Sequence, residues 1–314
     1  NGADIITASA GTSNFRAGVN AGNSIASGGN YNVVVGDEAG TALTIGDESV
    51  AVGFEALMTV TSGAENVGIG YRALKLTTGN SNVAVGKNAL ATNSSASNNT
   101  AVGTSALTAN TTGTGNVAVG KGALDANTTA NYNTAVGLDA LGTNTTGTNN
   151  NALGETALFS NTTGGNNQAI GRGALESNTT ASNNSAFGHH ALKANTTGSQ
   201  NVAVGDNALN ANTTADYNTA LGTSTLQLNT TGARNVATGA FSLTANTTGD
   251  GNIAMGYQAL KSNTTASNNT AIGDQALELN TTGTQNTALG ALSLDANTTG
   301  DNNVSLGYGA LTAN

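Results

Sequence analysis

The residues of this chain that could carry out catalysis or bind a metal are few and lie apart in the sequence. His189 and His190 form the only histidine pair, and the chain contains no cysteine. This pair could be a metal site or a surface turn. Because no further histidine or acidic cluster accompanies it in its own repeat, we expect a surface turn. Asp125, Asp206 and Asp274 occur singly and lack the Gly-Gly-x-Gly-x-Asp spacing of calcium-binding repeats. We therefore expect no enzyme, no cofactor and no metal site.

The triplet Asn-Thr-Thr occurs 12 times between Asn110 and Asn297 and is formally an N-glycosylation sequon each time. In a secreted archaeal or eukaryotic protein the asparagines, among them Asn110, Asn127, Asn144 and Asn161, would carry sugars. In a phage or in most bacteria the triplet would only form a recurring turn, which is what we expect. The threonine pairs also suggest ice binding as a candidate function, because flat threonine arrays can order water. We disfavour it because adjacent residues of a strand face opposite sides.

All of these residues lie in copies of one repeated unit, so the fold of that unit must position them. A glycine, here called the marker glycine, recurs every 17 residues from Gly103 to Gly307, and at intervals of 16 to 18 residues before that, starting at Gly18. Positions in a repeat are numbered from this glycine. Position −4 is Asn in every repeat except the one with Ser49, and position +4 is Leu from Leu57 onward. A fixed period of this length is the signature of a solenoid, here of about 18 coils.

The pattern within a repeat predicts short strands and tight turns. Val-Ala-Val before the marker glycine is alternating and β-branched, which predicts one short strand. Ala-Leu after it predicts a second short strand, and Asn-Thr-Thr-Gly predicts a turn. The predicted fold class is all-β, a parallel β-solenoid with Leu and Asn side chains stacked in ladders. Residues 1–60 form a divergent cap and first coils, with a candidate first strand at residues 4–8, and residues 61–314 form the regular repeat region.

The middle residue of the Val-Ala-Val strand, at position −2, is alanine in almost every coil. A face limited to so small a residue suggests that something packs closely against it. We therefore predict a homo-oligomer, a trimer above all, with an interface at this row: Ala84, Ala101, Ala118, Ala135, Ala203 and Ala220. The alternative is that alanine merely fits a narrow interior while the Val/Ile/Leu row faces outward or across chains.

Composition excludes several classes of partner. The net charge is −9 and the pI about 4.4, with Lys and Arg scattered singly, so nucleic acid and anionic membrane surfaces are disfavoured. No apolar run approaches the roughly 20 residues of a membrane-spanning helix, so we expect no membrane insertion. The sequence starts at Asn1, without an initiator methionine, and stops in mid-coil at Asn314. We expect processing or a fragment at the start, and truncation or a surface that meets another chain at the end.

The repeat resembles those of two related groups of proteins. Residues 82–86 (Asn-Val-Ala-Val-Gly) and 252–256 (Asn-Ile-Ala-Met-Gly), each followed by x-x-Ala-Leu, resemble the head domain of YadA-type trimeric autotransporter adhesins. Residues 32–40 and 47–53 particularly resemble the Asn-Thr-Thr-Gly-rich repeats of phage tail fibres. The resemblance extends from about Asn14 onward and implies a left-handed solenoid that assembles as a trimer. The coil is longer than that of the adhesin head by the Asn-Thr-Thr loop, and the chain shows neither heptad stalk nor membrane anchor.

These observations favour a structural role. The leading hypothesis is the rod or shaft of an extracellular, cell-surface or virion fibre that associates with itself. The first alternative is an adhesin that binds a host receptor or glycan, with Tyr132, Tyr217, Tyr257 and Tyr308 as contacts. Those tyrosines form no continuous ladder, which weakens this alternative. A subunit of a secreted filament that grows end to end is the second.

Overall fold

The structure, a computed structural model, describes residues 5–6 and 10–312. Its described residues form 19 strands and no helix. The strands are β1 (Ile5–Ile6), β2 (Phe15–Ala17), β3 (Val33–Val35), β4 (Val50–Val52), β5 (Val67–Ile69), β6 (Val83–Val85), β7 (Thr100–Val102), β8 (Val117–Val119), β9 (Thr134–Val136), β10 (Asn151–Leu153), β11 (Gln168–Ile170), β12 (Ser185–Phe187), β13 (Val202–Val204), β14 (Thr219–Leu221), β15 (Val236–Thr238), β16 (Ile253–Met255), β17 (Thr270–Ile272), β18 (Thr287–Leu289) and β19 (Val304–Leu306). The predicted all-β class is confirmed. Of the predicted first strand at residues 4–8, β1 is the described part; residues 4, 7 and 8 lie outside the described residues, as do residues 313–314.

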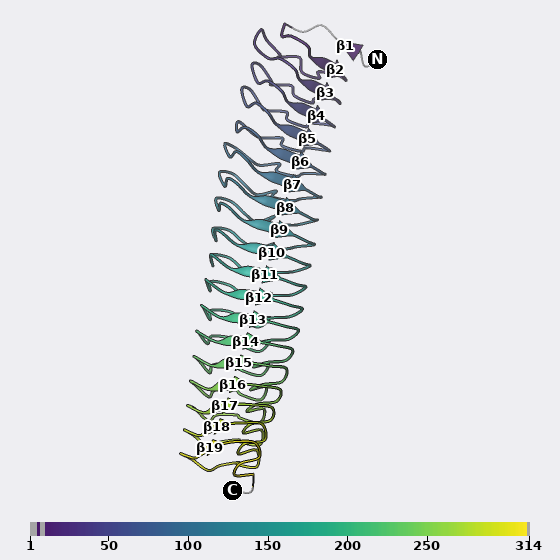
Figure 1. The fold of residues 1–314 in the computed structure, drawn as a ribbon. Helices are drawn as coiled ribbons and strands as arrows, with labels where there is room; N and C mark the ends of the chain where they lie inside the picture. The colour runs from purple at the N-terminus through teal and green to yellow at the C-terminus, as the bar shows by residue number, and fades with distance from the viewer. Residues whose placement is uncertain (1–4, 7–9, 313–314) are drawn as a thin grey trace. The chain divides into compact units, whose positions relative to one another are not determined.

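The chain divides into two compact units, residues 1–155 and 156–314, and each is a stack of coils. In the first unit, strands β2 to β10 pair in parallel with their neighbours, and each residue lies opposite its equivalent in the next coil, as Ala118 lies opposite Ala135. In the second unit, β11 to β19 pair in the same way. Figure 1 shows the strands of each unit stacked one above another along one side of the coils. The parallel β-solenoid is confirmed, and its 18 strands from β2 to β19 are joined by 17 turns of the chain.

The first coils are continuous with the regular ones despite their different turn sequences. β4 and β5, on either side of residue 60, pair in the same parallel register, with Val50 opposite Val67. Only β1 departs from this pattern. It pairs antiparallel with β2, with Ile5 opposite Ala17.

Each coil contains one strand, not the two predicted. The chain bends at the marker glycine, where Gly120 has φ of 139°, a conformation that L side chains rarely adopt. Every second residue after it has a positive φ: Gly122 at position +2 has φ of 68° and Leu124 at position +4 has φ of 52°. A leucine with positive φ cannot continue a strand, so the Ala-Leu segment is a turn. Local propensity did not reveal this, because left-handed leucine costs roughly 1–2 kcal/mol and is tolerated only when tertiary packing compensates.

The compensation comes from burial in a narrow interior. Within one coil of the first unit, Ala118, Ala123 and Leu124 are each 0% exposed, and two asparagines, Asn116 and Asn127, are equally buried. Full burial of a leucine contributes roughly 1.5–3 kcal/mol, which offsets its strained backbone. Because the same positions are buried in successive coils, each unit has a core of stacked Leu, Ala and Asn columns. The predicted Leu and Asn ladders are confirmed.

Candidate functional site on the outward face of the strands

The surface with the most exposed apolar side chains is the outward face of the strands, which positions −3 and −1 of each coil form. Position −1 is almost entirely apolar and is exposed or partly exposed in every coil. In the first unit it comprises Ala17, Val35, Val52, Ile69, Val85, Val102, Val119, Val136 and Leu153. In the second unit it comprises Ile170, Phe187, Val204, Leu221, Thr238, Met255, Ile272, Leu289 and Leu306. Apart from Ala17 and Thr238, these are large apolar side chains left in contact with water by the single chain.

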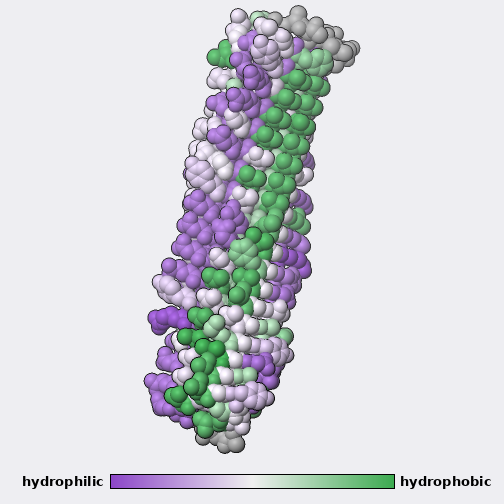
Figure 2. Space-filling model, in the orientation of Figure 1, coloured by the Kyte–Doolittle hydropathy of each residue, from purple (hydrophilic) through white to green (hydrophobic). Residues whose placement is uncertain are grey.

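This face carries no charge, whereas the adjoining turns carry almost all of the charge. None of the outward positions of strands β2 to β19 is Asp, Glu, Lys or Arg. At position +1, just beyond the marker glycine, charged residues are frequent in both units, for example Lys87, Lys121, Arg172 and Asp206. Figure 2 shows the consequence as a stripe of apolar residues over the strands, bordered by hydrophilic surface. A contiguous exposed apolar strip with a polar border is typical of an interaction site.

The row predicted as an oligomer interface lies elsewhere. Ala84, Ala101, Ala118, Ala135, Ala203 and Ala220 are each 0% exposed. Their side chains point into the coil and pack within their own chain, so a partner cannot contact them while the coil is closed. The prediction is therefore wrong for these residues. The alternative describes the structure: alanine fills the narrow interior, and the Val/Ile/Leu-rich row at position −1 faces outward.

The glycosylation sites considered for Asn110, Asn127, Asn144 and Asn161 are also excluded in the folded chain, because all four side chains are 0% exposed. The Asn127 Nδ2 donates to Asn110 Oδ1 at 2.9 Å and to the carbonyl of Ala130 at 3.1 Å. The Asn144 Nδ2 donates to Asn127 Oδ1 at 3.1 Å. A sugar on Nδ2 would remove a donor and would need space that the interior does not have. These asparagines instead form hydrogen-bonded ladders along the stack.

Both threonines of the Asn-Thr-Thr turn lie on the outside, contrary to the prediction that they face opposite sides. Thr128 is partly exposed and Thr129 is exposed, while Asn127 before them and Ala130 after them are buried. The segment is a turn, so the alternation of a strand does not apply. The Thr128 hydroxyl donates to the carbonyl of Thr145 in the next coil at 3.3 Å. The threonines thus join neighbouring coils at the surface.

The histidines and aspartates singled out from the sequence lie in surface turns. The His189 Nδ1 lies 2.9 Å from Asp206 Oδ1, and the rings of His189 and His190 are 3.7 Å apart between centroids. Burial, with a smaller contribution from Lys193, lowers the pKa of His190. Asp125 is less isolated than its sequence position indicates, because burial and the Asp139 carboxylate of the next coil raise its pKa.

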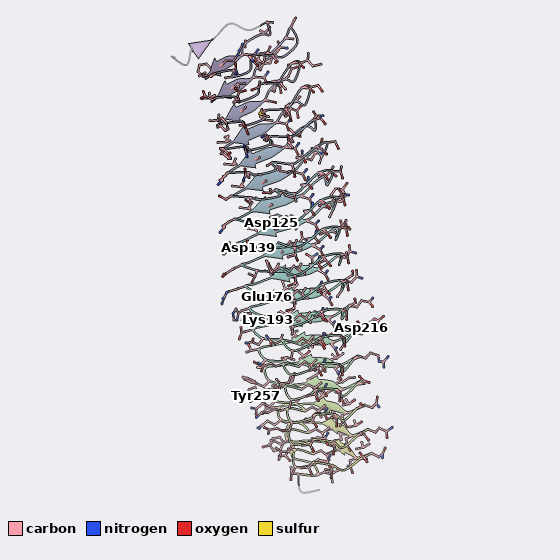
Figure 3. All side chains as sticks on the ribbon, turned by 180° about the vertical axis from the view of Figure 1, so that it is seen from behind. Asp125, Asp139, Glu176, Lys193, Asp216 and Tyr257 are labelled. Atoms are coloured by element: carbon pink, nitrogen blue, oxygen red, sulfur yellow. The ribbon has the colours of Figure 1, made fainter. Side chains whose placement is uncertain are left out.

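The tyrosines considered as ligand contacts are all exposed but lie at different places on the coil. Tyr132 and Tyr217 precede the strand at position −5 and are 64% and 56% exposed, whereas Tyr257 and Tyr308 follow it at position +1. In the second unit, Figure 3 shows Tyr257 on the same edge as Glu176 and Lys193, and Asp216 on the opposite edge. The structure therefore does not gather these tyrosines into one surface.

Sequence reasoning did not identify an aromatic and ionic cluster in the first unit. The rings of Phe54 and Tyr71 stack with centroids 5.7 Å apart, and the Arg72 guanidinium lies 4.9 Å from the Tyr71 centroid. The Glu55 carboxylate accepts from Arg72 at 2.7 Å and from Lys75 at 2.8 Å. The lysine and the arginine lower the pKa of Glu55. The one signal in the sequence was the spacing of 17 residues between Phe54 and Tyr71, which puts the two rings at the same position of neighbouring coils.

Across residues 5–6 and 10–312 we find no group of three or more His, Asp or Glu side chains placed to hold a metal ion. The described part of either unit encloses no pocket. A helix long and apolar enough to cross a membrane is likewise not found among the described residues.

In comparisons with known proteins, no protein-family model and no curated protein matches this chain.

Proposed function

We propose that this protein is a structural component of an extracellular, cell-surface or virion fibre, in which copies of the chain associate through the outward face of their strands. The observation that carries the proposal is that neither outward row carries a charge in strands β2 to β19, and that the exposed −1 row is apolar in all of these strands except β15. The stack of coils supplies a stiff support, and the face supplies a surface that is unfavourable to leave in water. A trimer is the proposed assembly, and the resemblance to trimeric adhesin heads and phage fibres supports it, as it supports a left-handed coil.

The size of the face fits an interface between copies. Three residues at about 3.3 Å each and a spacing of about 4.8 Å between strands give roughly 48 Å² per coil, or about 430 Å² for the nine coils of one unit. Stable interfaces bury about 800 Å² on each partner, so the face of one unit by itself contributes about half of that area. Burial of partly exposed Val, Ile and Leu side chains would then drive association at roughly 25 cal/mol per Å².

The proposal is tested by the mass and shape of the particle. Light scattering after size-exclusion chromatography at micromolar concentration is expected to give three times the chain mass of 30.6 kDa. Negative-stain microscopy of the same fractions is expected to show short spikes of uniform length. A single-chain mass at every concentration would overturn the proposal. Open filaments of variable length would instead support the end-to-end alternative, and saturable binding to a glycan array by the single chain would support an adhesin.

The chemistry of the face can be tested directly with a matched pair of variants. Val119→Lys places a charge at position −1 of β8, and Leu138→Lys places one at position +1 of the next coil, which is 42% exposed. Only the first is expected to disrupt the assembly, because a lysine on the apolar face would have to be buried without a partner. Equal effects of the two variants would show that the strand face is not the interface.

A further inference from the structure

The first coil of the stack differs from the others in the row that points into the interior. Position −2 is alanine, valine, glycine or serine in strands β3 to β19, whereas in β2 it is Arg16. Arg16 is therefore the one charged residue at this position among strands β2 to β19. A charged side chain that points inward at the edge of a sheet is one of the devices by which proteins prevent a further strand from adding there.

Arg16 donates to the carbonyl that would otherwise receive a preceding coil. Between successive coils, the backbone amide of position +4 donates to the carbonyl of position +3 in the next coil, as Gly22 does to Ala39 at 2.9 Å. The equivalent carbonyl of the first coil is that of Ala21, and among the described residues no coil lies before it. The Arg16 Nε donates to the Ala21 carbonyl at 2.7 Å. The guanidinium thus takes the place of the amide of a preceding coil.

The stem of Arg16 also fills the interior of the first coil. Position +4 is leucine from Leu57 onward, but it is Gly22 in this coil. A Cβ on Gly22 would lie 3.3 Å from the Arg16 Nε and 3.5 Å from its Cδ, so the arginine occupies the space that a leucine takes in a regular coil. Ala21 and Ile25 of the same coil are only 2% and 6% exposed. The first coil therefore has a closed interior without a coil stacked before it.

A second element closes the strand edge of the first coil. β2 pairs in parallel with β3 on one side, and on its other side it pairs antiparallel with β1, in which Ile6 lies opposite Arg16. Figure 1 shows β1 beside β2 at the N-terminal end of the stack. A further coil would have to present a parallel strand to the edge that β1 already covers. β1 has two residues, and very short edge strands are another device that limits strand addition.

We infer that Arg16 and β1 together form a terminator, which closes the N-terminal end of the stack against end-to-end association with the last coil of a second copy. A coil stacked on this end would displace the guanidinium from the Ala21 carbonyl and bury its charge without a carboxylate partner, which is strongly unfavourable. The inference concerns a different surface from the strand face and does not depend on association through that face. It opposes the alternative of a filament that grows end to end.

The terminator can be removed without leaving a hole in the interior, because a regular coil of the same unit supplies the template. Three substitutions give the first coil the interior residues of the coil that contains β4: Arg16→Ala, Gly22→Leu and Ile25→Val. The residues at the same positions of the β4 coil are at most 1% exposed. Ile5→Pro with Ile6→Pro removes the backbone donors of β1 and with them its pairing. The combined variant carries all five substitutions.

End-to-end contact is measured as a disulfide between two differently tagged copies, because the chain has no native cysteine. Val19→Cys in one copy and Tyr308→Cys in the other place a cysteine at position +1 of the first and of the last coil, where the native residues are 52% and 80% exposed. Equivalent residues of adjacent coils lie about 4.8 Å apart, which a disulfide can span. The combined variant is expected to give at least tenfold more of this disulfide than the parent chain, and negative-stain microscopy is expected to show particles of at least twice the parent length.

Two controls separate end-to-end stacking from other effects. Val19→Cys with Tyr257→Cys, also at position +1 but three coils before the last, is expected to show no increase, because only lateral contact would join these coils. Arg234→Ala removes an exposed arginine of the second unit and is expected to leave the parent behaviour unchanged. Circular dichroism establishes that each variant is folded. A folded combined variant that forms the Val19–Tyr308 disulfide no better than the parent would overturn the inference, and so would end-to-end filaments of the parent chain.

Discussion

The buried asparagine ladder at position +7 permits a quantitative test of what holds the coils together. The same column is apolar at its start, where Leu43 and Val60 are buried, and becomes asparagine from Asn93 onward. Thr77 lies at the junction, and its Oγ1 accepts a hydrogen bond of 2.9 Å from the Asn93 Nδ2. Because valine is accommodated in this column, Asn127→Val should fit sterically and should act mainly through hydrogen bonding.

The expected cost follows from the partners of Asn127. The substitution removes two donated hydrogen bonds, to Asn110 and Ala130, and one accepted from Asn144. The carbonyl of Ala130 still accepts a hydrogen bond of 2.8 Å from the Asn116 Nδ2, but Asn110 Oδ1 loses the hydrogen bond that the Asn127 Nδ2 donates to it. An unsatisfied buried acceptor costs about 1–3 kcal/mol, and each lost bond about 1 kcal/mol. The additional buried methyl groups return roughly 1–2 kcal/mol. We expect a net loss of about 2–5 kcal/mol in the free energy of unfolding.

Thr77→Val is the matched control, because it introduces the same residue in the same column. It removes the acceptor of two hydrogen bonds, one from the Asn93 Nδ2 and one of 3.2 Å from the Gly79 amide. The Asn93 Nδ2 still donates to the carbonyl of Ala96 at 2.9 Å. We expect a loss of about 1–2 kcal/mol. Urea unfolding, monitored by circular dichroism, measures the free energy of unfolding of both variants. Hydrogen exchange shows whether amide protection falls first in the coils around the substitution. If Asn127→Val costs no more than Thr77→Val, the ladder does not stabilise the stack as argued.

Three further predictions concern single positions. Ser242 is 0% exposed and its Oγ has no hydrogen-bond partner, so Ser242→Ala should increase the free energy of unfolding by about 1–2 kcal/mol and raise the melting temperature. Ser293→Ala should lower the melting temperature, because the Ser293 Oγ donates a hydrogen bond of 2.8 Å to the Ser305 Oγ. Burial and a neighbouring carboxylate raise the pKa of Asp125 in the folded state, so its charged form opposes folding above that pKa. Asp125→Asn should therefore increase stability at pH 7, and the gain should vanish as the pH falls below the ordinary aspartate pKa of 3.8. A gain that persists at lower pH would contradict this cause. A Cβ on Gly120 would lie 2.3 Å from the carbonyl oxygen of Gly137, so Gly120→Ala should cost more than the roughly 1–3 kcal/mol of backbone strain alone; denaturant unfolding within 1 kcal/mol of the parent would refute it.

The fold was largely predictable because the period constrains it. Once each residue must stack on its equivalent 17 positions away, parallel pairing in register and the Leu and Asn ladders follow. The turn after the marker glycine did not follow, because Ala-Leu has no local preference for the left-handed conformation that Leu124 adopts. That conformation exists because the interior needs a leucine at that point of a tight coil, which is a property of the closed coil and not of the segment.

Which side of the strand is buried was harder to infer, because both sides are apolar. Hydrophobicity does not distinguish Ala118 from Val117 and Val119, and the interface was therefore assigned to the buried row. The informative signal was variation in size. A closed interior accepts one volume, so the inward row stays close to alanine, whereas the outward rows range from alanine to phenylalanine. In the same way, the exchange of Leu43 and Val60 for asparagine in one column indicates burial, since a surface turn would have no reason to begin with apolar residues.

The same distinction bears on how a repetitive chain can specify an assembly. Identical coils are interchangeable, so a perfectly regular face would bind a second copy almost equally well in many registers. Only departures from the repeat can encode position along the stack. In this chain the departures that remain apolar are concentrated in the −1 row of β11 to β19, while the interior beneath them is repeated with little change. If copies associate through this face as proposed, stability and recognition rest on different residues of the same strand, and substitutions in the outward row should alter affinity without unfolding the coils.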